Sequence, residues 1–240
     1  MNVPKGHPRY ESLLYRERVA DGVKAGYTSS IGLVAHGRGE AFDYLLGEKT
    51  SDYARAACEA AVAKLLEGNA VLSANGNVAA LCAEEYVALS SAVNAPIEIN
   101  LFYRTPARMR LMEQRFLRAG AKQVLGTLED AEVPGLESER RKVDSRGIFS
   151  RRTVLVPLED GDRTEYLKKM GKFVIAIDLN PFSRTAKMAD ITIVDNIVRA
   201  VPLMEKLAAR NPKWHGFDNA ANLRGSMAVM AKNLGAQQPI

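Results

Sequence analysis

Six short runs rich in Val, Ile and Leu recur along the chain, and each one ends in polar or turn-forming residues. The runs span residues 70–74, 96–103, 122–127, 153–159, 173–177 and 191–194. Apolar runs of this length, bounded by turn residues, predict buried strands of a parallel sheet.

Segments with helical signals alternate with these runs. We expect helices over residues 8–25, 40–46, 51–67, 77–93, 105–120, 162–170 and 218–234, and short helices that begin at Ser183 and Asn196. This alternation predicts an α/β fold with a mostly parallel, doubly wound sheet. We expect a single domain over residues 1–240, with a helical N-terminal appendage over 1–50 and a C-terminal helix within 215–235.

The composition narrows the class of protein. The apolar fraction of 47% is ordinary for a globular chain, and no apolar run reaches membrane-spanning length. Both cysteines, Cys58 and Cys82, lie in Ala-rich helical segments, which favours a reducing cytoplasm over a disulfide. The net charge is +5, but Lys and Arg are mixed with Asp and Glu along the chain, which argues against a nucleic-acid binder.

Polar clusters follow the predicted strands, and the carboxyl ends of parallel strands meet at one edge of a sheet. After the run 173–177, Asp178 suits ribose hydroxyls and Asn180 an adenine edge, although both residue types are also common in turns. Ser183-Arg184-Thr185 suits an anion at a helix start, or an ordinary cap. Asn196, at the next predicted helix start, allows the same two interpretations.

Two further clusters suggest phosphate and metal chemistry. In residues 36–40, Arg38 lies between two glycines, so the pattern predicts a loop whose backbone approaches a phosphate, or merely a flexible loop. Asp160 and Asp162 follow the run 153–159, where they could hold Mg²⁺ through water or cap the next helix. The sequence contains no GxxxxGK[ST] loop, no GxGxxG fingerprint and no Ser-His-Asp order, so any nucleotide site is of an uncommon kind.

Several strings in the chain resemble the archaeal-type 4-phosphopantoate–β-alanine ligases. They are HPRYESLLYRE, GLVAHGRGEAFDYLLGEKT, NGNVAAL, IEINLFYRT, PGLES, KVD, PLEDGDRTE, MGKFVIAIDLNP and ADITIVDNIVRA. The resemblance covers most of residues 7–205, weakens over the last ~35 residues, and departs from the family pattern at Arg141, where the family has Gly. It implies a Rossmann-like homodimer that joins 4-phosphopantoate to β-alanine in coenzyme A biosynthesis, with ATP cleaved to AMP and pyrophosphate through an acyl adenylate.

The resemblance also implies a set of ATP contacts. Matched motif by motif, they are Arg16, Arg38, Asp178, Leu179, Asn180, Arg184, Thr185, Asn196 and Ile197. Residue chemistry alone points to most of these positions, but not to Arg16, which is one charge on a helix face.

The expected reaction suggests roles for the other clusters. We expect Arg38, Asp160 and Asp162 to act in catalysis, with Mg²⁺ accompanying the triphosphate. For 4-phosphopantoate the candidates are Asn75, Asn77, Arg104 and Lys142. A non-catalytic, nucleotide-binding regulator is the alternative function, and helix 51–67 could form either a dimer interface or part of the core.

Overall fold

The computed structural model describes residues 4–7 and 9–236, and its centre is a six-stranded sheet in which every pairing is parallel. The strands, in spatial order, are β3 (Val124–Leu125), β2 (Ile97–Ile99), β1 (Ala70–Ala74), β6 (Thr153–Pro157), β7 (Phe173–Ile177) and β8 (Ile191–Ile193). The predicted doubly wound sheet is therefore confirmed. The strands expected over 96–103 and 122–127 are much shorter than predicted.

The strand order places β1 and β6 side by side, with the chain continuing outward in opposite directions from them. This reversal of strand order is the topological switch point, where ligands of open α/β sheets bind outside the carboxyl ends of the strands. Asn75 spans this point, since its Nδ2 donates to the Pro157 and Leu158 carbonyls at 2.9 and 3.2 Å.

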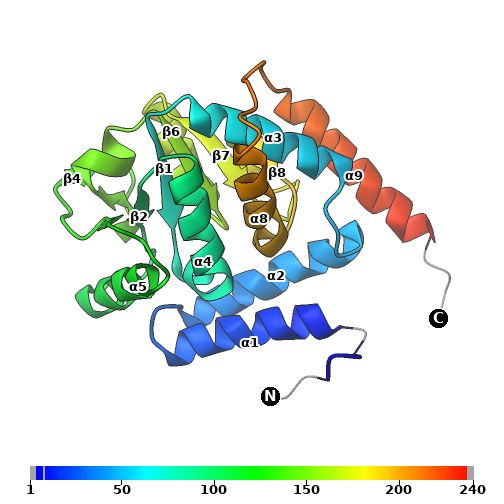
Figure 1. Ribbon diagram of the computed structural model, residues 1–240, viewed down its shortest axis with the longest axis horizontal. Helices are drawn as coiled ribbons and strands as arrows, with labels where there is room; N and C mark the ends of the chain where they lie inside the picture. Colours follow the sequence, from blue (N-terminus) through cyan, green and yellow to red (C-terminus); the bar gives the residue numbers. More distant parts are fainter. Residues whose placement is uncertain (1–3, 8, 237–240) are drawn as a thin grey trace.

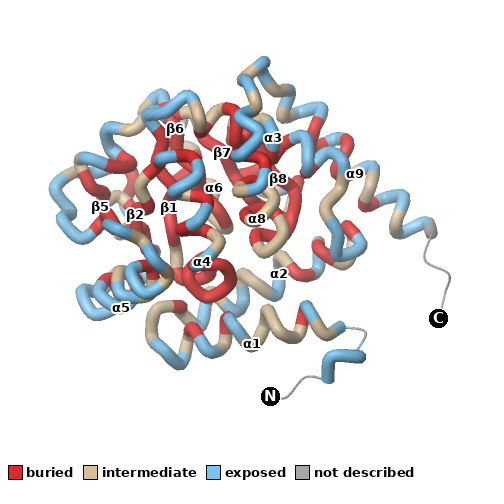
Figure 2. The backbone as a smooth tube through the Cα atoms, in the orientation of Figure 1, coloured by how far each residue is buried: buried red, intermediate tan, exposed pale blue. Residues whose placement is uncertain are grey.

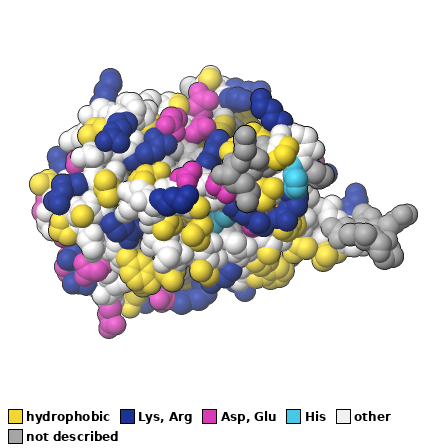
Figure 3. Space-filling view, turned by 90° about the horizontal axis from the view of Figure 1, so that it is seen from below, with side chains coloured by type: hydrophobic (Ala, Val, Ile, Leu, Met, Phe, Trp, Pro, Cys, Tyr) yellow, Lys and Arg dark blue, Asp and Glu magenta, His cyan; other side chains and the backbone are white. Residues whose placement is uncertain are grey.

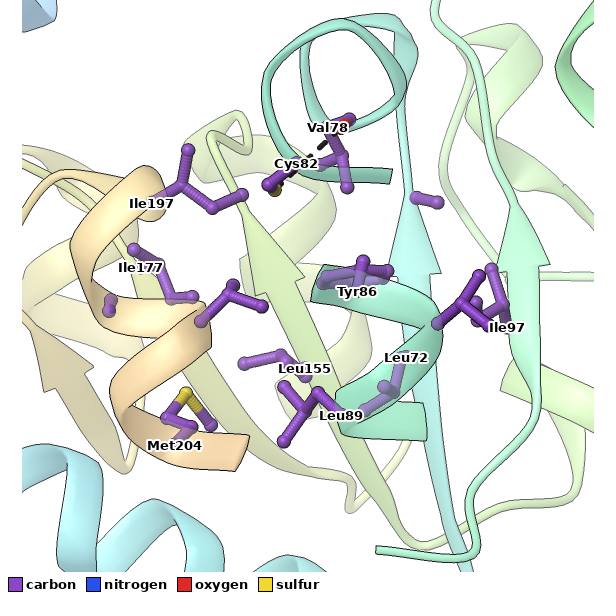
Figure 4. Close-up of a cluster of buried hydrophobic side chains, with 14 of the residues drawn as sticks. Leu72, Val78, Cys82, Tyr86, Leu89, Ile97, Leu155, Ile177, Ile197 and Met204 are labelled. Carbon is purple, nitrogen blue, oxygen red and sulfur yellow. Dashed lines mark hydrogen bonds between the residues drawn. The ribbon is translucent and has the colours of Figure 1, made fainter. Parts of the chain in front are cut away.

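Helices cover one face of the sheet (Figure 1). They are α3 (Asp52–Leu66), α4 (Gly76–Ala92), α5 (Pro106–Arg118) and α8 (Ile197–Ala208). Tyr86 and Leu89 of α4 and Met204 of α8 point at Leu155 and Ile177 of the sheet (Figure 4). The Ala-rich helix α3 packs its small side chains into this core, so its inner face is buried within the chain.

The opposite face is covered by α6 (Gly161–Lys169) and by the segment that follows β3. This segment shows no clear hydrophobic periodicity in the sequence, yet it folds into a small antiparallel pair with two short helical turns. Its elements are β4 (Ala131–Glu132), η1 (Glu139–Arg141), β5 (Lys142–Val143) and η2 (Ser145–Phe149). The Glu98 carboxylate of β2 holds it in place by accepting hydrogen bonds from the backbone N–H groups of Asp144 and Ile148.

The N-terminal helices α1 (Tyr10–Lys24) and α2 (Ser30–Leu46) run below the sheet, across the lower end of α4 (Figure 1). The expectation of a glycine loop before a helix at residue 40 is wrong, because α2 is continuous from Ser30. Ser29 caps it by accepting from Gly32 N. A Cβ at Gly32 would lie only 2.6 Å from Asn77 Oδ1, so this glycine lets α2 lie close to the start of α4.

Two helices complete the fold beside β7 and β8. They are α7 (Arg184–Met188) and α9 (Asn219–Ala236), and Leu223 and Met230 of α9 pack with Leu46 of α2 and Leu179. In Figure 2 the strands and the inner faces of the helices are buried, whereas much of α1 is only partly buried or exposed.

Two predicted helix starts shift by one or two residues. Asn75, not Asn77, caps α4, since its side chain accepts from the backbone of Asn77 and Val78. Asp160 caps α6 by accepting from Arg163 N at 2.8 Å, so that helix begins at Gly161 and not at Asp162.

Among the described residues, no helix is both long and apolar enough to cross a membrane. On the face of the molecule seen from below, Lys and Arg side chains lie among acidic and hydrophobic ones and do not form a single stripe (Figure 3).

Candidate active site

A cleft of about 770 Å³ lies at the carboxyl ends of four neighbouring strands, β2, β1, β6 and β7. Helix α2 forms its opposite wall through Ala35, Arg38, Gly39 and Phe42, which share one face of the helix because they recur three or four residues apart. The lining therefore combines the sheet edge that the sequence predicted with a helix of which the sequence predicted only residues 40–46.

Three helices begin at the wall of this cleft. Their amino caps are Asn75 for α4, Asp160 for α6 and Ser183 for α7, and each accepts a hydrogen bond from the first turn of its helix. The remaining N–H groups and the dipoles of the longer helices α4 and α6 favour negative charge in front of them. The cleft is thus suited to phosphate and carboxylate groups.

The β7 end of the cleft is lined by Asp178, Leu179 and Asn180, which the sequence assigned to ATP. The Asp178 carboxylate accepts from Asn180 N at 2.9 Å and from the Ser183 hydroxyl at 2.5 Å. Burial raises the pKa of Asp178, and these hydrogen bonds together with the nearby Arg38 guanidinium partly offset that rise. The loop is a rigid turn with a carboxylate at its base.

Two of the predicted phosphate ligands line the same end. Arg38 is exposed in the cleft, and among the described residues no carboxylate lies within ion-pair distance of it. Arg184 lies across the cleft and is paired at the surface with Asp162 at 2.6 Å and with Glu165 at 2.7 Å. Thr185 also lines the cleft, with its hydroxyl donating to the Glu159 carbonyl.

The β1 end contains both predicted asparagines. Asn75 fixes the switch point, as described above. Asn77 donates from Nδ2 to the Gly32 carbonyl at 3.0 Å, and its buried Oδ1 has no hydrogen-bond partner within the described chain. Asn77 thereby joins α4 to α2, and its Oδ1 lies against Gly32.

Two arginines that the sequence analysis did not single out line the cleft near β2. Arg108 comes from the first turn of α5, and Arg140 comes from η1. Arg140 lies in the charged run 137–142, which contains both acidic and basic residues, so that a solvated surface is the ordinary interpretation. The only signal in the sequence was the unusual length of the segment around it, residues 128–150, which shows no clear periodicity.

A buried ionic cluster stands behind Arg140. Its guanidinium pairs with Glu159, and the same carboxylate pairs with Arg163 of α6, which also donates to Ser73 Oγ at 3.1 Å. Burial lowers the pKa of both arginines to about 10, so both remain charged at neutral pH. Glu159 therefore fixes Arg140 against the cleft wall.

Two of the predicted substrate ligands, Arg104 and Lys142, do not line the cleft. Arg104 donates to Glu129 at 2.9 Å and to the Gly126 carbonyl, while Lys142 pairs with Glu139 at 2.8 Å. Acidic or backbone partners hold both side chains, and none of the carboxylates in these pairs lines the cleft.

Asn196 and Ile197 also lie outside the lining. Asn196 caps α8 and donates from Nδ2 to Asp43 of α2 at 2.8 Å, and Ile197 is part of the core. Arg199 pairs with the same Asp43. In this structure these residues anchor the helix that carries Arg38 to the end of β8.

Arg16 lies on the far side of α2 from the cleft. Its Nε donates to Glu40 at 2.8 Å, and both residues line a second cavity of about 450 Å³ that also includes His36. Burial lowers the pKa of His36. Within one chain, Arg16 and Asp178 thus belong to different cavities.

The acidic residues of the cleft are the groups of the chain that could hold the expected Mg²⁺. Among the described residues, no group of three or more His, Cys, Asp or Glu side chains could hold a metal ion. Asp160 lines the cleft, and its Oδ2 has no hydrogen-bond partner but lies 3.4 Å from Arg140 Nη1, whereas Asp162 is outside the lining and paired with Arg184. A carboxylate in this position would suit a Mg²⁺ ion whose other ligands are phosphate oxygens and water.

The parallel sheet, and at its switch point a cleft lined by arginines and helix N-termini, define a Rossmann-like α/β protein with a site for acidic ligands. Comparison with known proteins makes this more specific. The model of the phosphopantothenate/pantothenate synthetase family matches residues 53–232, and the chain belongs to that family.

Curated relatives cover most of the chain. A 4-phosphopantoate–β-alanine ligase of Thermococcus kodakarensis is 57% identical over 210 residues, which span 87% of this chain and 80% of the relative. The ligase of that name from Methanosarcina mazei is 54% identical over 213 residues, spanning 88% and 84%. The corresponding protein of Methanospirillum hungatei is 48% identical over 200 residues, spanning 83% and 82%.

Proposed function

We propose that this protein is an ATP-dependent ligase that condenses 4-phosphopantoate with β-alanine to 4′-phosphopantothenate in coenzyme A biosynthesis. The observation that carries the proposal is the cleft at the switch point. Asp178, Leu179 and Asn180, which the sequence assigned to ATP, line one end of this cleft, and Arg108 and Arg140 line the other. The family membership and the names of the relatives support the same reaction. A purely regulatory nucleotide-binding role has no such support.

In the proposed reaction, the carboxylate of 4-phosphopantoate attacks the α-phosphate of ATP and pyrophosphate leaves. The amine of β-alanine then attacks the carbonyl carbon of the acyl adenylate, and AMP leaves. Neither step needs a covalent bond to the protein. The chain therefore contributes by positioning the reactants and by stabilising the charge that develops on phosphate.

The contacts of the cleft suggest how the reactants lie. Asp178, Leu179 and Asn180 hold the nucleoside, while Arg38, Arg184 and Thr185 meet the triphosphate. Arg184 would exchange its surface carboxylates for phosphate oxygens, which accept from the same guanidinium fork. Asp160 would hold Mg²⁺, and the ion would supply positive charge that neutralises the pyrophosphate.

Identification of the nucleotide product tests this proposal. Purified protein is incubated with ATP, Mg²⁺, 4-phosphopantoate and β-alanine, and the products are separated by ion-exchange chromatography. We expect AMP that requires both the acid and the amine, and pyrophosphate–ATP exchange that requires the acid alone. ADP as the product, or hydrolysis that ignores the two substrates, would contradict the proposal.

We also propose that the protein acts as a homodimer that forms through the α1–α2 face. Leu33 and Val34 near the start of α2 are 36% and 58% exposed, and neither lines the cleft. Apolar side chains gathered in this way mark contact surfaces. A dimer through this face accounts for a role of Arg16 at the ATP site, which it does not reach within its own chain. Light scattering coupled to gel filtration should give twice the chain mass, and a monomer would contradict the proposal.

The proposed location is the cytoplasm. Both cysteines are free and buried, and burial raises the pKa of each thiol well above its ordinary value. Buried, protonated thiols that form no disulfide are ordinary in a reducing compartment.

A further inference from the structure

Arg38 lies between two contacts that hold α2 to the rest of the fold. Toward the start of the helix, the Gly32 carbonyl accepts from Asn77 Nδ2 at 3.0 Å. Toward its end, the Asp43 carboxylate is buried and enters a cluster of polar side chains at the end of β8. Arg38 itself is exposed in the cleft, and no ion pair of the described residues fixes its side chain. Its position therefore depends on how α2 is held.

The cluster at the end of β8 contains two carboxylates and one guanidinium. Arg199 donates to Asp43 from Nη2 at 2.5 Å and to Asp195 from Nε at 2.9 Å. Asp43 also accepts from Asn196 Nδ2 at 2.8 Å, and Asp195 accepts from the Thr50 hydroxyl at 2.6 Å. Burial raises the pKa of Asp195, and the Arg199 guanidinium opposes that rise. Arg199 thus bridges the two carboxylates, and through Asp43 it joins α8 to α2.

This bridge is the strongest charged contact of α2, because water cannot readily replace it. Asp43 and Asp195 are only 4% and 1% exposed, and loss of one partner from a buried pair costs far more than loss of an exposed pair. The other ion pairs of α2 among the described residues are those of Glu40 with Arg9 and Arg16, and they join α2 to α1. Asp43 is therefore the charged group that fixes α2 relative to the sheet.

The position of Arg38 is sensitive to this contact. Arg38 and Asp43 lie ~7.5 Å apart along the axis of α2, since each helical residue adds about 1.5 Å. Gly37 and Gly39 flank Arg38 and lower the helix propensity of this turn, so tertiary contacts rather than propensity keep it in place. Misplacement of a catalytic group by ~1 Å can lower a rate about 10²-fold. A small shift of α2 at Asp43 is therefore sufficient to affect catalysis at Arg38.

We propose that Asp43 is a positioning residue of the adenylation step, which holds Arg38 at the phosphates of ATP through its buried pair with Arg199. This inference rests on the proposed function, which gives Arg38 its role. Neither Asp43 nor Arg199 lines the cleft, so both act through α2 and not by contact with a ligand. The turn after β8 adjoins the turn after β7, since Asp178 N donates to the Ile193 carbonyl at 3.1 Å. The pair thus keeps Arg38 in register with the turn that holds the nucleoside.

Replacement of Asp43 by Asn weakens the pair with little disturbance of the fold. The amide keeps the size of the side chain and an oxygen that accepts hydrogen bonds, and Arg199 remains paired with Asp195. Asp21→Asn is the matched control, because Asp21 is exposed on α1 and lies outside the cleft lining. Circular dichroism and urea unfolding show whether each variant folds.

A double-mutant cycle with Arg38→Ala separates positioning from a purely structural role. The maximum rate of pyrophosphate–ATP exchange is measured for the wild type, Asp43→Asn, Arg38→Ala and the double variant. Asp43→Asn should lower this rate about tenfold in the wild-type chain, with an unchanged KM for 4-phosphopantoate, and should have no effect once Ala replaces Arg38. Asp21→Asn should match the wild type.

An equal fold-loss in both backgrounds, or a wild-type rate for Asp43→Asn, overturns the proposal. If Asp43→Asn does not fold, the same cycle is measured with Arg199→Lys, which keeps the charge but cannot bridge both carboxylates. The same outcomes then decide.

The role of Asp43 can be judged separately from the proposed function. If the wild type binds ATP but catalyses no exchange, the proposed function fails, and the four proteins of the cycle are titrated calorimetrically with ATP. A loss of affinity in Asp43→Asn that disappears in the Arg38→Ala background supports the positioning role. Equal losses in both backgrounds, no loss, or no binding of ATP by the wild type refutes it.

Discussion

Replacement of Arg38 by Ala should lower the rate of adenylate formation ~10²- to 10³-fold, as the loss of a charge-stabilising donor does in other enzymes. Arg38 is the exposed cation of the cleft that faces Asp178, and it lacks a carboxylate partner among the described residues. Its charge is therefore free to meet the phosphate oxygens on which charge develops. The fold should survive, because Ala is the best helix former and α2 is continuous through this position.

Pyrophosphate–ATP exchange at saturating ATP and 4-phosphopantoate measures this step directly. Arg38→Lys, which keeps the charge but not the bidentate geometry, should fall between Ala and the wild type. Arg110→Ala serves as the control, because Arg110 is exposed on α5 and lies outside the cleft lining. Turnover of Arg38→Ala near the wild-type rate would refute the role given to Arg38.

Replacement of Glu98 by Gln should remove a pH-dependent contribution of roughly 3 kcal/mol to the free energy of unfolding. Glu98 is fully buried in β2, and burial raises the pKa of its carboxyl from 4.5 to about 7, although two backbone N–H groups and Arg163 oppose the rise. Below pH 4.5 both the folded and the unfolded chain hold the proton. Between pH 4.5 and 7 only the folded chain does, so this group's contribution to stability is lost as the pH rises and is constant above 7.

Urea unfolding at pH 4.5, 6 and 8 measures the effect. The free energy of unfolding of Glu98→Gln, relative to the wild type, should increase with pH across this range. At low pH the variant should be no more stable than the wild type, because Gln can accept only one of the two backbone hydrogen bonds. Glu59→Gln, at an exposed position on α3, should follow the wild type at every pH. A constant difference between Glu98→Gln and the wild type would show that Glu98 does not titrate in this range.

The pattern of apolar runs was sufficient to predict the strands of the sheet. Runs such as 70–74 and 173–177 are strands with the predicted bounds, because buried parallel strands must be apolar on both faces. The residues that cap the helices could be predicted almost as well as the strands. Ser51, Thr105, Ser183 and Asn196 cap the predicted helices, since a side-chain acceptor at a helix start is a local requirement.

The glycines within residues 30–40 led to the wrong prediction of a loop. Gly37 and Gly39 lower helix propensity, which favours a loop, yet α2 is one helix. Its helical state depends on packing against α4, α9 and the turn after β7, where Leu179 contacts the backbone at Gly39. Such contacts are made by residues far apart in the chain, so no local pattern reveals them.

The sequence by itself determined the class of sheet, the edge at which ligands meet and most of the polar groups there, because each depends on the residues of one strand and its turn. Only the tertiary structure decided which cations enter the cleft. It placed Arg38, Arg108 and Arg140 in the lining, and it held Arg104 and Lys142 on carboxylates outside it. The physical reason is that the direction and pairing of a long charged side chain depend on the acidic groups that surround it, and these come from other parts of the chain.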